Sequence, residues 1–143
     1  MDKGTKFESR VGKLTCNSEE VYDFVTDLRN FERFLPHDVV TDWHAEKNSC
    51  NFRVHPLGNV NLRLTEKEPS RKVIFSGEAL QTNSFSLFLQ ISGTDSKPAE
   101  VRITLNAELN PILKIMAAKP VTIFLEALIT EMERFRGWHD IKA

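Results

Sequence analysis

The residue types that most often perform acid–base or metal chemistry are sparse in this sequence and lie far apart along it. The chain has four histidines, at His37, His44, His55 and His139. Their spacing matches no metal-binding motif, and neither Cys16 nor Cys50 has a second ligand close by in sequence or belongs to a CxxC pair. We therefore expect no metal site and no cofactor, and we interpret Cys50 as a small core residue.

General acid–base catalysis requires a titratable side chain that faces a cavity. Where the sequence alternates like a β-strand, the ionisable residues fall opposite the large apolar ones: Glu8, Arg10, Asp42, His44, Arg53, Arg63 and Arg102. The apolar face carries only Ser9 and Thr41 as polar groups. His44 and Asp42 could pair at the surface, but solvated side chains are the simpler interpretation. The pattern predicts no catalytic constellation, so an enzyme is the less favoured function.

The size and charge of the chain exclude several classes of protein. Its 143 residues fit one domain, which we assign to residues 1–143. A net charge of −1 with both signs interspersed argues against binding to nucleic acid. The first residues form no apolar leader, and no window reaches the ~20 apolar residues of a membrane-spanning helix. We expect a cytoplasmic protein without stable membrane insertion.

Seven segments alternate with the period of two that is typical of a half-buried strand. They cover approximately residues 6–14, 38–46, 50–54, 60–65, 73–75, 85–91 and 101–106. Most of the connections are short, which favours antiparallel pairing. Each strand has one apolar and one polar face, so we expect a sheet that covers a core on one side and meets water on the other.

Helical patterns occur at two places. Between the first two strands, Asn17 or Ser18 can cap one short helix, and residues 30–35 form a second that ends at Pro36. Near the C-terminus, Asn110 and Pro111 begin another helix. We expect a short helix to about Ala118, a break or kink at Pro120, and then a longer helix that runs to Arg136 and is stopped by Gly137.

These elements predict an α+β fold of the helix-grip type. A wide sheet with one apolar face must curl to cover the apolar face of the long helix. We therefore expect a curved seven-stranded antiparallel sheet around a long C-terminal helix. The two short helices between strands 1 and 2 would close one end.

Two stretches carry a resemblance to a known superfamily. SEEVYDFVTDLRNFERFLP (18–36) is an aromatic-rich helix with an Asp near its end and an aromatic before proline, and ELNPILKIMAAKPVTIFLEALITEM (108–132) is a proline-broken helix entry. With these, the chain resembles the Bet v 1-like, START-related superfamily. It is most similar to the branch of small bacterial proteins related to polyketide cyclases and dehydrases. The resemblance implies binding of a hydrophobic ligand such as a lipid, a quinone or a polyketide.

Alternation along the strands and the period of the last helix define the residues that should face an apolar ligand. They are Trp43, Phe52, Leu64, Phe75, Phe85, Leu87, Leu89, Ile103, Met116, Phe124 and Leu128. The alternative is that the same side chains form a solid core. Gly77, in the middle of a strand, favours a bulge or a close approach of two backbones.

The sequence leaves three functions open. The first is a carrier or sensor that encloses a small hydrophobic molecule. The second is a polyketide cyclase- or dehydrase-like enzyme, which requires at least one ionisable side chain in the cavity. The third is a protein-interaction module without a ligand, although no feature of the sequence indicates a protein partner.

Overall fold

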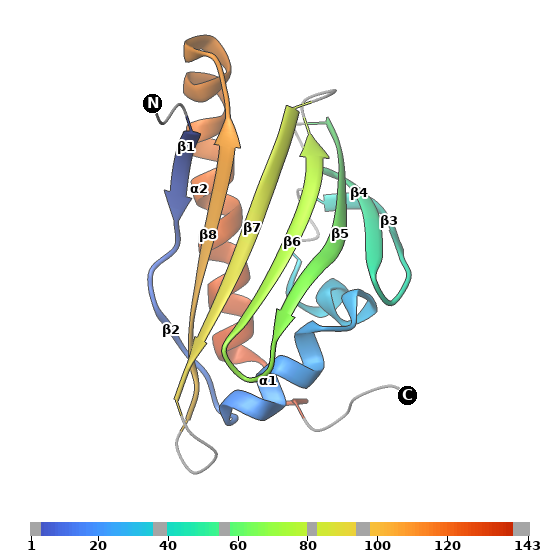
Figure 1. Ribbon diagram of the computed structural model, residues 1–143, viewed down its shortest axis with the longest axis vertical. Helices are drawn as coiled ribbons and strands as arrows, with labels where there is room; N and C mark the ends of the chain where they lie inside the picture. Colours follow the sequence, from blue (N-terminus) through green and yellow to red (C-terminus); the bar gives the residue numbers. More distant parts are fainter. Residues whose placement is uncertain (1–3, 36–39, 55–57, 80–82, 94–97, 139–143) are drawn as a thin grey trace.

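The strands form one antiparallel sheet in a computed structural model that describes residues 4–35, 40–54, 58–79, 83–93 and 98–138. Within these residues it has eight strands: β1 (Gly4–Glu8), β2 (Gly12–Lys13), β3 (Val40–Ala45), β4 (Ser49–Val54), β5 (Gly58–Glu68), β6 (Lys72–Ala79), β7 (Asn83–Ser92) and β8 (Glu100–Glu108). Their order is β1-β8-β7-β6-β5-β4-β3, and β2 also pairs with β8. The sheet curves around α2 (Pro111–Arg134), as Figure 1 shows. The predicted helix-grip architecture is confirmed.

The first predicted strand is interrupted at Ser9, which gives β1 and β2 in place of one element. The backbone N–H of Ser9 donates to the carbonyl of Ile103, and its hydroxyl accepts a hydrogen bond from the Ile103 N–H at 2.9 Å. Because the side chain takes over one bond of the ladder, the alternation restarts at Gly12, which pairs with Val101. Alternation along residues 6–14 predicts that Val11 faces inward with Ser9, but Val11 is exposed.

A bulge in β3 also shifts the predicted alternation. Asp42 has a φ of 56°, and the pairing with β4 changes register between Thr41 and His44. The extra residue places Val40 in the core and Thr41 in solvent. The expectation that Thr41 faces inward was therefore wrong.

The two short helices, α1 (Ser18–Val25) and η1 (Leu28–Phe34), begin at side-chain caps. The Asn17 side chain accepts from the Glu20 N–H at 2.9 Å, and the Glu20 carboxylate accepts from the Asn17 N–H, which completes a capping box. Asp27 caps η1 by accepting from the Arg29 N–H. α1 contacts β6 and β7, and η1 contacts β3, β4 and α2, so the pair closes one end of the sheet as predicted.

The C-terminal helix differs from its prediction, because α2 runs unbroken from Pro111 to Arg134 with Pro120 inside it. Proline at position 120 removes the hydrogen bond to the carbonyl of Met116. Met116 lies on an exposed turn, where water can satisfy that group, while Val121 and Leu125 beyond the proline are buried against the sheet. Packing therefore outweighs the loss of one bond.

The end of α2 also falls earlier than predicted. Arg136 Nη1 donates to the carbonyls of Glu133 and Phe135 at 2.8 and 3.1 Å. These bonds satisfy carbonyls that the last turn leaves without an amide partner. The helix thus ends at Arg134, two residues before the predicted end at Arg136.

Arg10 clamps the C-terminal half of α2 to the segment between β1 and β2. It forms ion pairs with Glu126 at 3.2 Å and Glu133 at 2.9 Å, and it donates a hydrogen bond to Thr130. Glu133 also accepts from the Lys13 N–H. The hydrogen bond from Arg10 is the main cause that lowers the pKa of Glu133 below its ordinary value.

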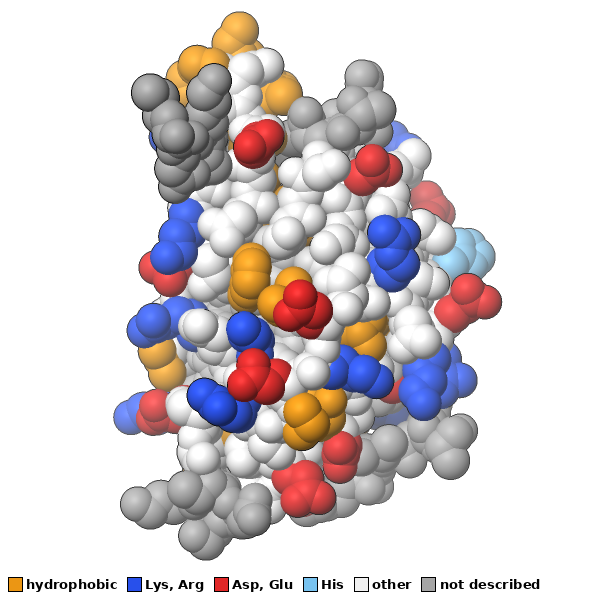
Figure 2. Space-filling view, in the orientation of Figure 1, with side chains coloured by type: hydrophobic (Ala, Val, Ile, Leu, Met, Phe, Trp, Pro, Cys, Tyr) orange, Lys and Arg blue, Asp and Glu red, His pale blue; other side chains and the backbone are white. Residues whose placement is uncertain are grey.

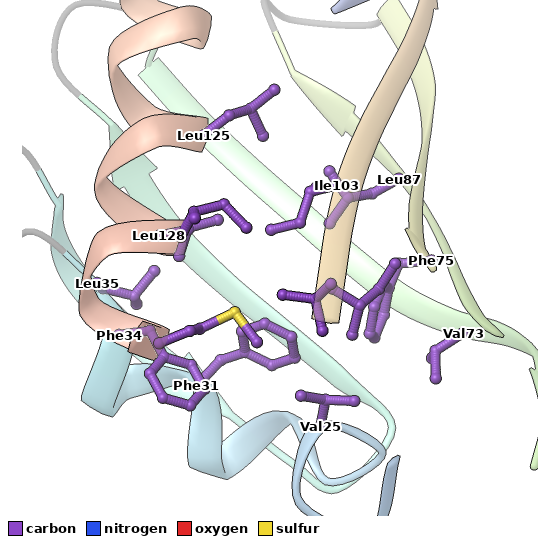
Figure 3. Packing of buried hydrophobic residues seen from close by; sticks show 14 of the residues in the cluster. Val25, Phe31, Phe34, Leu35, Val73, Phe75, Leu87, Ile103, Leu125 and Leu128 are labelled. Atoms are coloured by element: carbon purple, nitrogen blue, oxygen red, sulfur yellow. The ribbon is translucent and has the colours of Figure 1, made fainter. Parts of the chain in front are cut away.

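The filled part of the core lies between the C-terminal half of α2, the middle of the sheet and the two short helices. Figure 3 shows Leu125 and Leu128 directed from α2 towards Ile103 of the sheet. From the other side, the ring of Phe31 meets that of Phe75 edge to face, with centroids 5.5 Å apart. The large side chains of this half of the core are buried against one another.

Candidate ligand-binding cavity

An apolar cavity lies between the N-terminal half of α2 and the end of the sheet opposite to the short helices. The volume open to the centre of a water molecule is about 80 Å³, several times the roughly 10–15 Å³ that one water needs. Its described lining comes from the strands, from α2 and from the connection between β8 and α2: Phe7, Phe52, Val54, Val60, Leu62, Ala79, Phe85, Leu87, Leu105, Ala107, Leu109, Ala117, Val121 and Phe124.

The register of the sheet explains where the hollow begins. The row Val73–Leu89–Ile103 is fully buried under α2 and the short helices. Two residues along each strand, Leu87 and Leu105 already line the cavity, whereas their neighbour Phe75 is covered by Phe31. In the following row, Gly77 stands where the neighbouring strands carry Leu62 and Phe85. Along the strands, the inner face of the sheet thus changes from packed core to cavity lining within two rows of residues.

Gly77 marks a close approach of two backbones, as its position in the sequence predicted. A Cβ at this position would overlap the carbonyl oxygen of Asn61 on β5, and it would lie 3.0 Å from Cζ of Phe85. A residue with a side chain would push β5 away from β6. The missing side chain therefore permits β5 and β6 to approach each other closely at this point.

Aromatic rings form one wall of the cavity. Phe52 on β4 and Phe124 on α2 are stacked with ring centroids 6.3 Å apart, and Trp43 packs behind Phe52 at 5.6 Å. Phe52 and Phe124 line the cavity, whereas Trp43 is half-buried outside the described lining. The stack joins the sheet to the helix across the hollow.

The structure brings together four of the residues that the sequence assigned to ligand binding: Phe52, Phe85, Leu87 and Phe124. Phe75, Leu89, Ile103 and Leu128 face inward as expected but belong to the filled half of the core, and Leu64 and Trp43 are half-buried beside it. Met116 was expected to face the sheet and is 59% exposed. This expectation was wrong, because continuation of α2 through Pro120 turns Met116 away from the sheet.

Further lining residues carry a signal in the sequence that the ligand-site prediction did not use. Several of them lie on the inner face of a strand, two residues from another inward-facing apolar residue: Val54, Val60, Leu62, Leu105 and Ala107. Ala79, Ala107 and Ala117 are small residues at inward positions, where a short side chain leaves volume unfilled. Small inward residues at the strand ends nearest to the start of α2 were the available clue.

The described lining contains no ionisable side chain. Burial raises the pKa of the Cys50 thiol to about 12, and burial together with the charge of Glu20 raises that of Cys16 to about 12. Neither thiol is thus primed as a nucleophile at neutral pH. His44 and Asp42 are exposed on β3, as expected, whereas His37, His55 and His139 lie outside the described residues.

The described residues contain neither a cluster that could hold a metal ion nor a membrane-spanning helix. Among them, no three His, Cys, Asp or Glu side chains are placed to hold a metal ion. In the same part of the chain, no helix is both long enough and apolar enough to cross a membrane.

The chain is similar to known proteins in its three-dimensional structure. No family model matches the chain, and no curated protein matches it. XoxI from Bacillus cereus is 10% identical with a TM-score of 0.66, over 93% of this chain and 94% of that one. Norcoclaurine synthase from Thalictrum flavum is 5% identical with a TM-score of 0.66, over 92% and 85%. The fold is shared.

A third similar structure is DynU16, from the dynemicin biosynthetic locus. It is 14% identical with a TM-score of 0.58, and the match covers 94% of this chain and 47% of DynU16. At these identities the likeness concerns the fold, an antiparallel sheet with a C-terminal helix, for which norcoclaurine synthase is a Bet v 1-like example. The narrower resemblance to small polyketide cyclase-like proteins stays a prediction.

Proposed function

We propose that this protein binds a small hydrophobic molecule in the cavity between α2 and the sheet and acts as its carrier or sensor. The observation that carries the proposal is an unfilled space whose described lining is entirely apolar. Such a space gains free energy by burying apolar surface, at roughly 25 cal/mol per Å². The candidate ligands are a lipid, a quinone or a polyketide-like molecule.

The chemistry of the lining restricts the part of the ligand that enters. An ionised or strongly polar group would lose its hydration without gaining a partner from the described side chains. The cavity therefore accepts a ring or a short alkyl segment, and a polar group of the same ligand stays towards solvent. The volume of about 80 Å³ admits a small group without rearrangement.

The enzymatic alternative has less support. A cyclase or dehydrase requires an acid or base at the substrate, and the described lining offers neither. The names of norcoclaurine synthase and of the dynemicin-locus protein connect the fold with small organic molecules. These names fit a ligand of the proposed class, but they add no catalytic residue to this chain.

The proposal can be tested by adding apolar compounds of increasing size and recording the melting temperature. A ligand present at about 100 times its Kd stabilises the native state by about 2.7 kcal/mol, which raises the melting temperature by roughly 5–10 °C in a domain of this size. If no ring, quinone or alkyl compound raises it, the proposal fails.

Two substitutions on one face of β7 provide a matched pair. Leu87 lines the cavity, whereas Leu89 lies in the filled core two residues away. Leu87→Trp should fill the hollow and abolish the ligand-induced shift, while lowering the free energy of unfolding by less than about 1.5 kcal/mol. Leu89→Trp should overpack the core and cost about 3 kcal/mol. Unchanged ligand binding by Leu87→Trp would place the ligand elsewhere.

A further inference from the structure

The exposed apolar side chains of this protein are concentrated at one end of α2. Among the described residues, the large hydrophobic side chains that are exposed are Val11, Ile112, Ile115, Met116 and Ile123. The last four lie between the start and the middle of α2, with exposed fractions between 53% and 78%. Figure 2 shows hydrophobic side chains gathered at the tip where this helix begins.

The four residues lie on one face of the helix. Their spacing of three, four and seven residues follows the helical period, and Lys119 lies within the same stripe. We call this set (Ile112, Ile115, Met116, Lys119 and Ile123) the α2 stripe. One helix face thus concentrates apolar surface that the core does not use.

The same face of α2 is polar beyond residue 123. Glu126, Thr130 and Glu133 continue the stripe towards the C-terminus, and there Arg10 covers it with ion pairs and a hydrogen bond. The chain therefore supplies its own polar partner for the second half of this face. In the first half the isoleucines remain in contact with solvent. Clusters of this kind on a protein surface mark interaction sites.

The positive charge of the first part of α2 favours an anionic partner. Between Leu109 and Leu125 the chain contains Lys114 and Lys119 and no acidic residue. The first turn of α2 also lacks the acidic residues that α1 has at Glu19 and Glu20, so the positive end of its dipole is not offset there. Glu108 is the nearest acidic residue in sequence and precedes the cap.

A lipid bilayer fits these features better than a second copy of the chain. A standard protein interface engages about 20–30 residues on each side. The stripe contains five residues and begins where the first turns of α2 extend past the sheet (Figure 1). In a symmetric dimer through the stripe, both copies of Lys119 would lie within a mostly apolar interface, where charged residues are disfavoured. Anionic headgroups instead attract lysines while apolar side chains enter the acyl boundary.

We propose that the α2 stripe docks this protein onto the surface of an anionic lipid bilayer. The turns that carry the stripe also carry Ala117, Val121 and Phe124, which line the cavity from the other side of the helix. Docking would bring the cavity next to the membrane. The docking itself is independent of the proposed ligand, whereas transfer of a ligand from the bilayer would rest on the proposed function.

The test is binding of the whole chain to vesicles in a flotation assay. We expect binding to vesicles made of phosphatidylcholine and phosphatidylserine in equal parts, and at least about tenfold weaker binding to phosphatidylcholine alone. The double substitution Ile112→Ser/Ile115→Ser should weaken binding at least about tenfold. Val11→Ser, an exposed apolar residue outside the stripe, should leave it unchanged.

Charge and assembly provide independent readouts. Lys119→Glu should reduce binding to phosphatidylserine vesicles several-fold, whereas Lys67→Glu, an exposed lysine on β5, should have no effect. Equal binding of wild type and the double variant overturns the proposal, and so does a dimer in light scattering that the double variant dissociates. Ligand-induced shifts in melting temperature should persist in every stripe variant, so failure of docking is distinguishable from failure of ligand binding.

Discussion

The rings of Phe52 on β4 and Phe124 on α2 lie nearly parallel, with 15° between their planes and 6.3 Å between their centroids. They come from elements far apart in the sequence, and both line the cavity. Because one ring belongs to the sheet and the other to the helix, their contact sets the width of the hollow at this level. Removing either ring should change both stability and the size of ligand accepted.

Phe124→Ala should lower the free energy of unfolding by about 2 kcal/mol, less than for a fully buried Phe because this ring is partly exposed. It should also admit compounds too large to stabilise the wild type. Ile123→Ala, at the adjacent exposed position, should stay within about 0.5 kcal/mol. Urea unfolding and melting with a graded ligand series measure both effects. Equal losses from the two substitutions would contradict the assigned facing of the helix.

Gly77→Ala should be among the most destabilising small substitutions in the sheet. The added methyl group would overlap the backbone of Asn61, so β5 and β6 must separate, and we expect a loss of about 3 kcal/mol. Gly58→Ala is the control: its φ of 89° is unfavourable for alanine, but no atom lies within 4 Å of the new Cβ. A cost of about 1 kcal/mol is expected there. Similar costs at the two positions would refute the close approach.

Asp27 should contribute to stability in a pH-dependent manner. Its carboxylate accepts hydrogen bonds from Nε and Nη2 of Arg29 at 2.9 and 2.6 Å and from the Arg29 N–H, and these bonds lower its pKa from 3.8. A lowered pKa means that the contribution is complete above the unfolded value and is lost as the pH falls through the folded value. We expect the loss to begin near pH 4 and to continue below it.

Asp27→Ala should therefore cost about 1–2 kcal/mol at pH 7, through the lost cap and the lost ion pair. The difference from wild type should shrink as the pH falls below 4. Asp23→Ala, an exposed position on α1, serves as the control and should have little effect. Urea titrations at several pH values measure these differences, and a gap that stays constant down to pH 2 would rule out this role.

Pro120→Ala should stabilise the protein, by about 1 kcal/mol or more. The helix is continuous through this position, and alanine would restore the hydrogen bond to the Met116 carbonyl. Pro111→Ala provides the contrast, since proline is favoured at the first position of a helix and its loss should be neutral or mildly unfavourable. Denaturant unfolding measures both. Destabilisation by Pro120→Ala would mean that the proline shapes the helix in a way that packing requires.

Local patterns in the sequence determined the elements of this fold. The capping box of Asn17 and Glu20 and the cap and proline at Asn110 and Pro111 involve residues at most three positions apart, so their geometry is readable without tertiary context. The same holds for the alternation that directs Phe52, Phe85 and Leu87 to the inner face. Period and capping are properties of neighbouring residues, and they sufficed to predict a curved sheet around a C-terminal helix.

Tertiary packing decided which inward residues border empty space. Leu87 and Leu89 have the same side chain, strand and face, yet one lines the cavity and the other is buried among residues from α2 and the short helices. Phe75 is covered by the ring of Phe31, whereas Leu62 and Phe85 in the next row of the sheet line the cavity. Met116 faces solvent because α2 continues through Pro120, and the burial of residues beyond the proline favours that continuous helix. A hollow depends on the volumes of residues brought together from distant segments, and alternation along a single strand carries no information about those volumes.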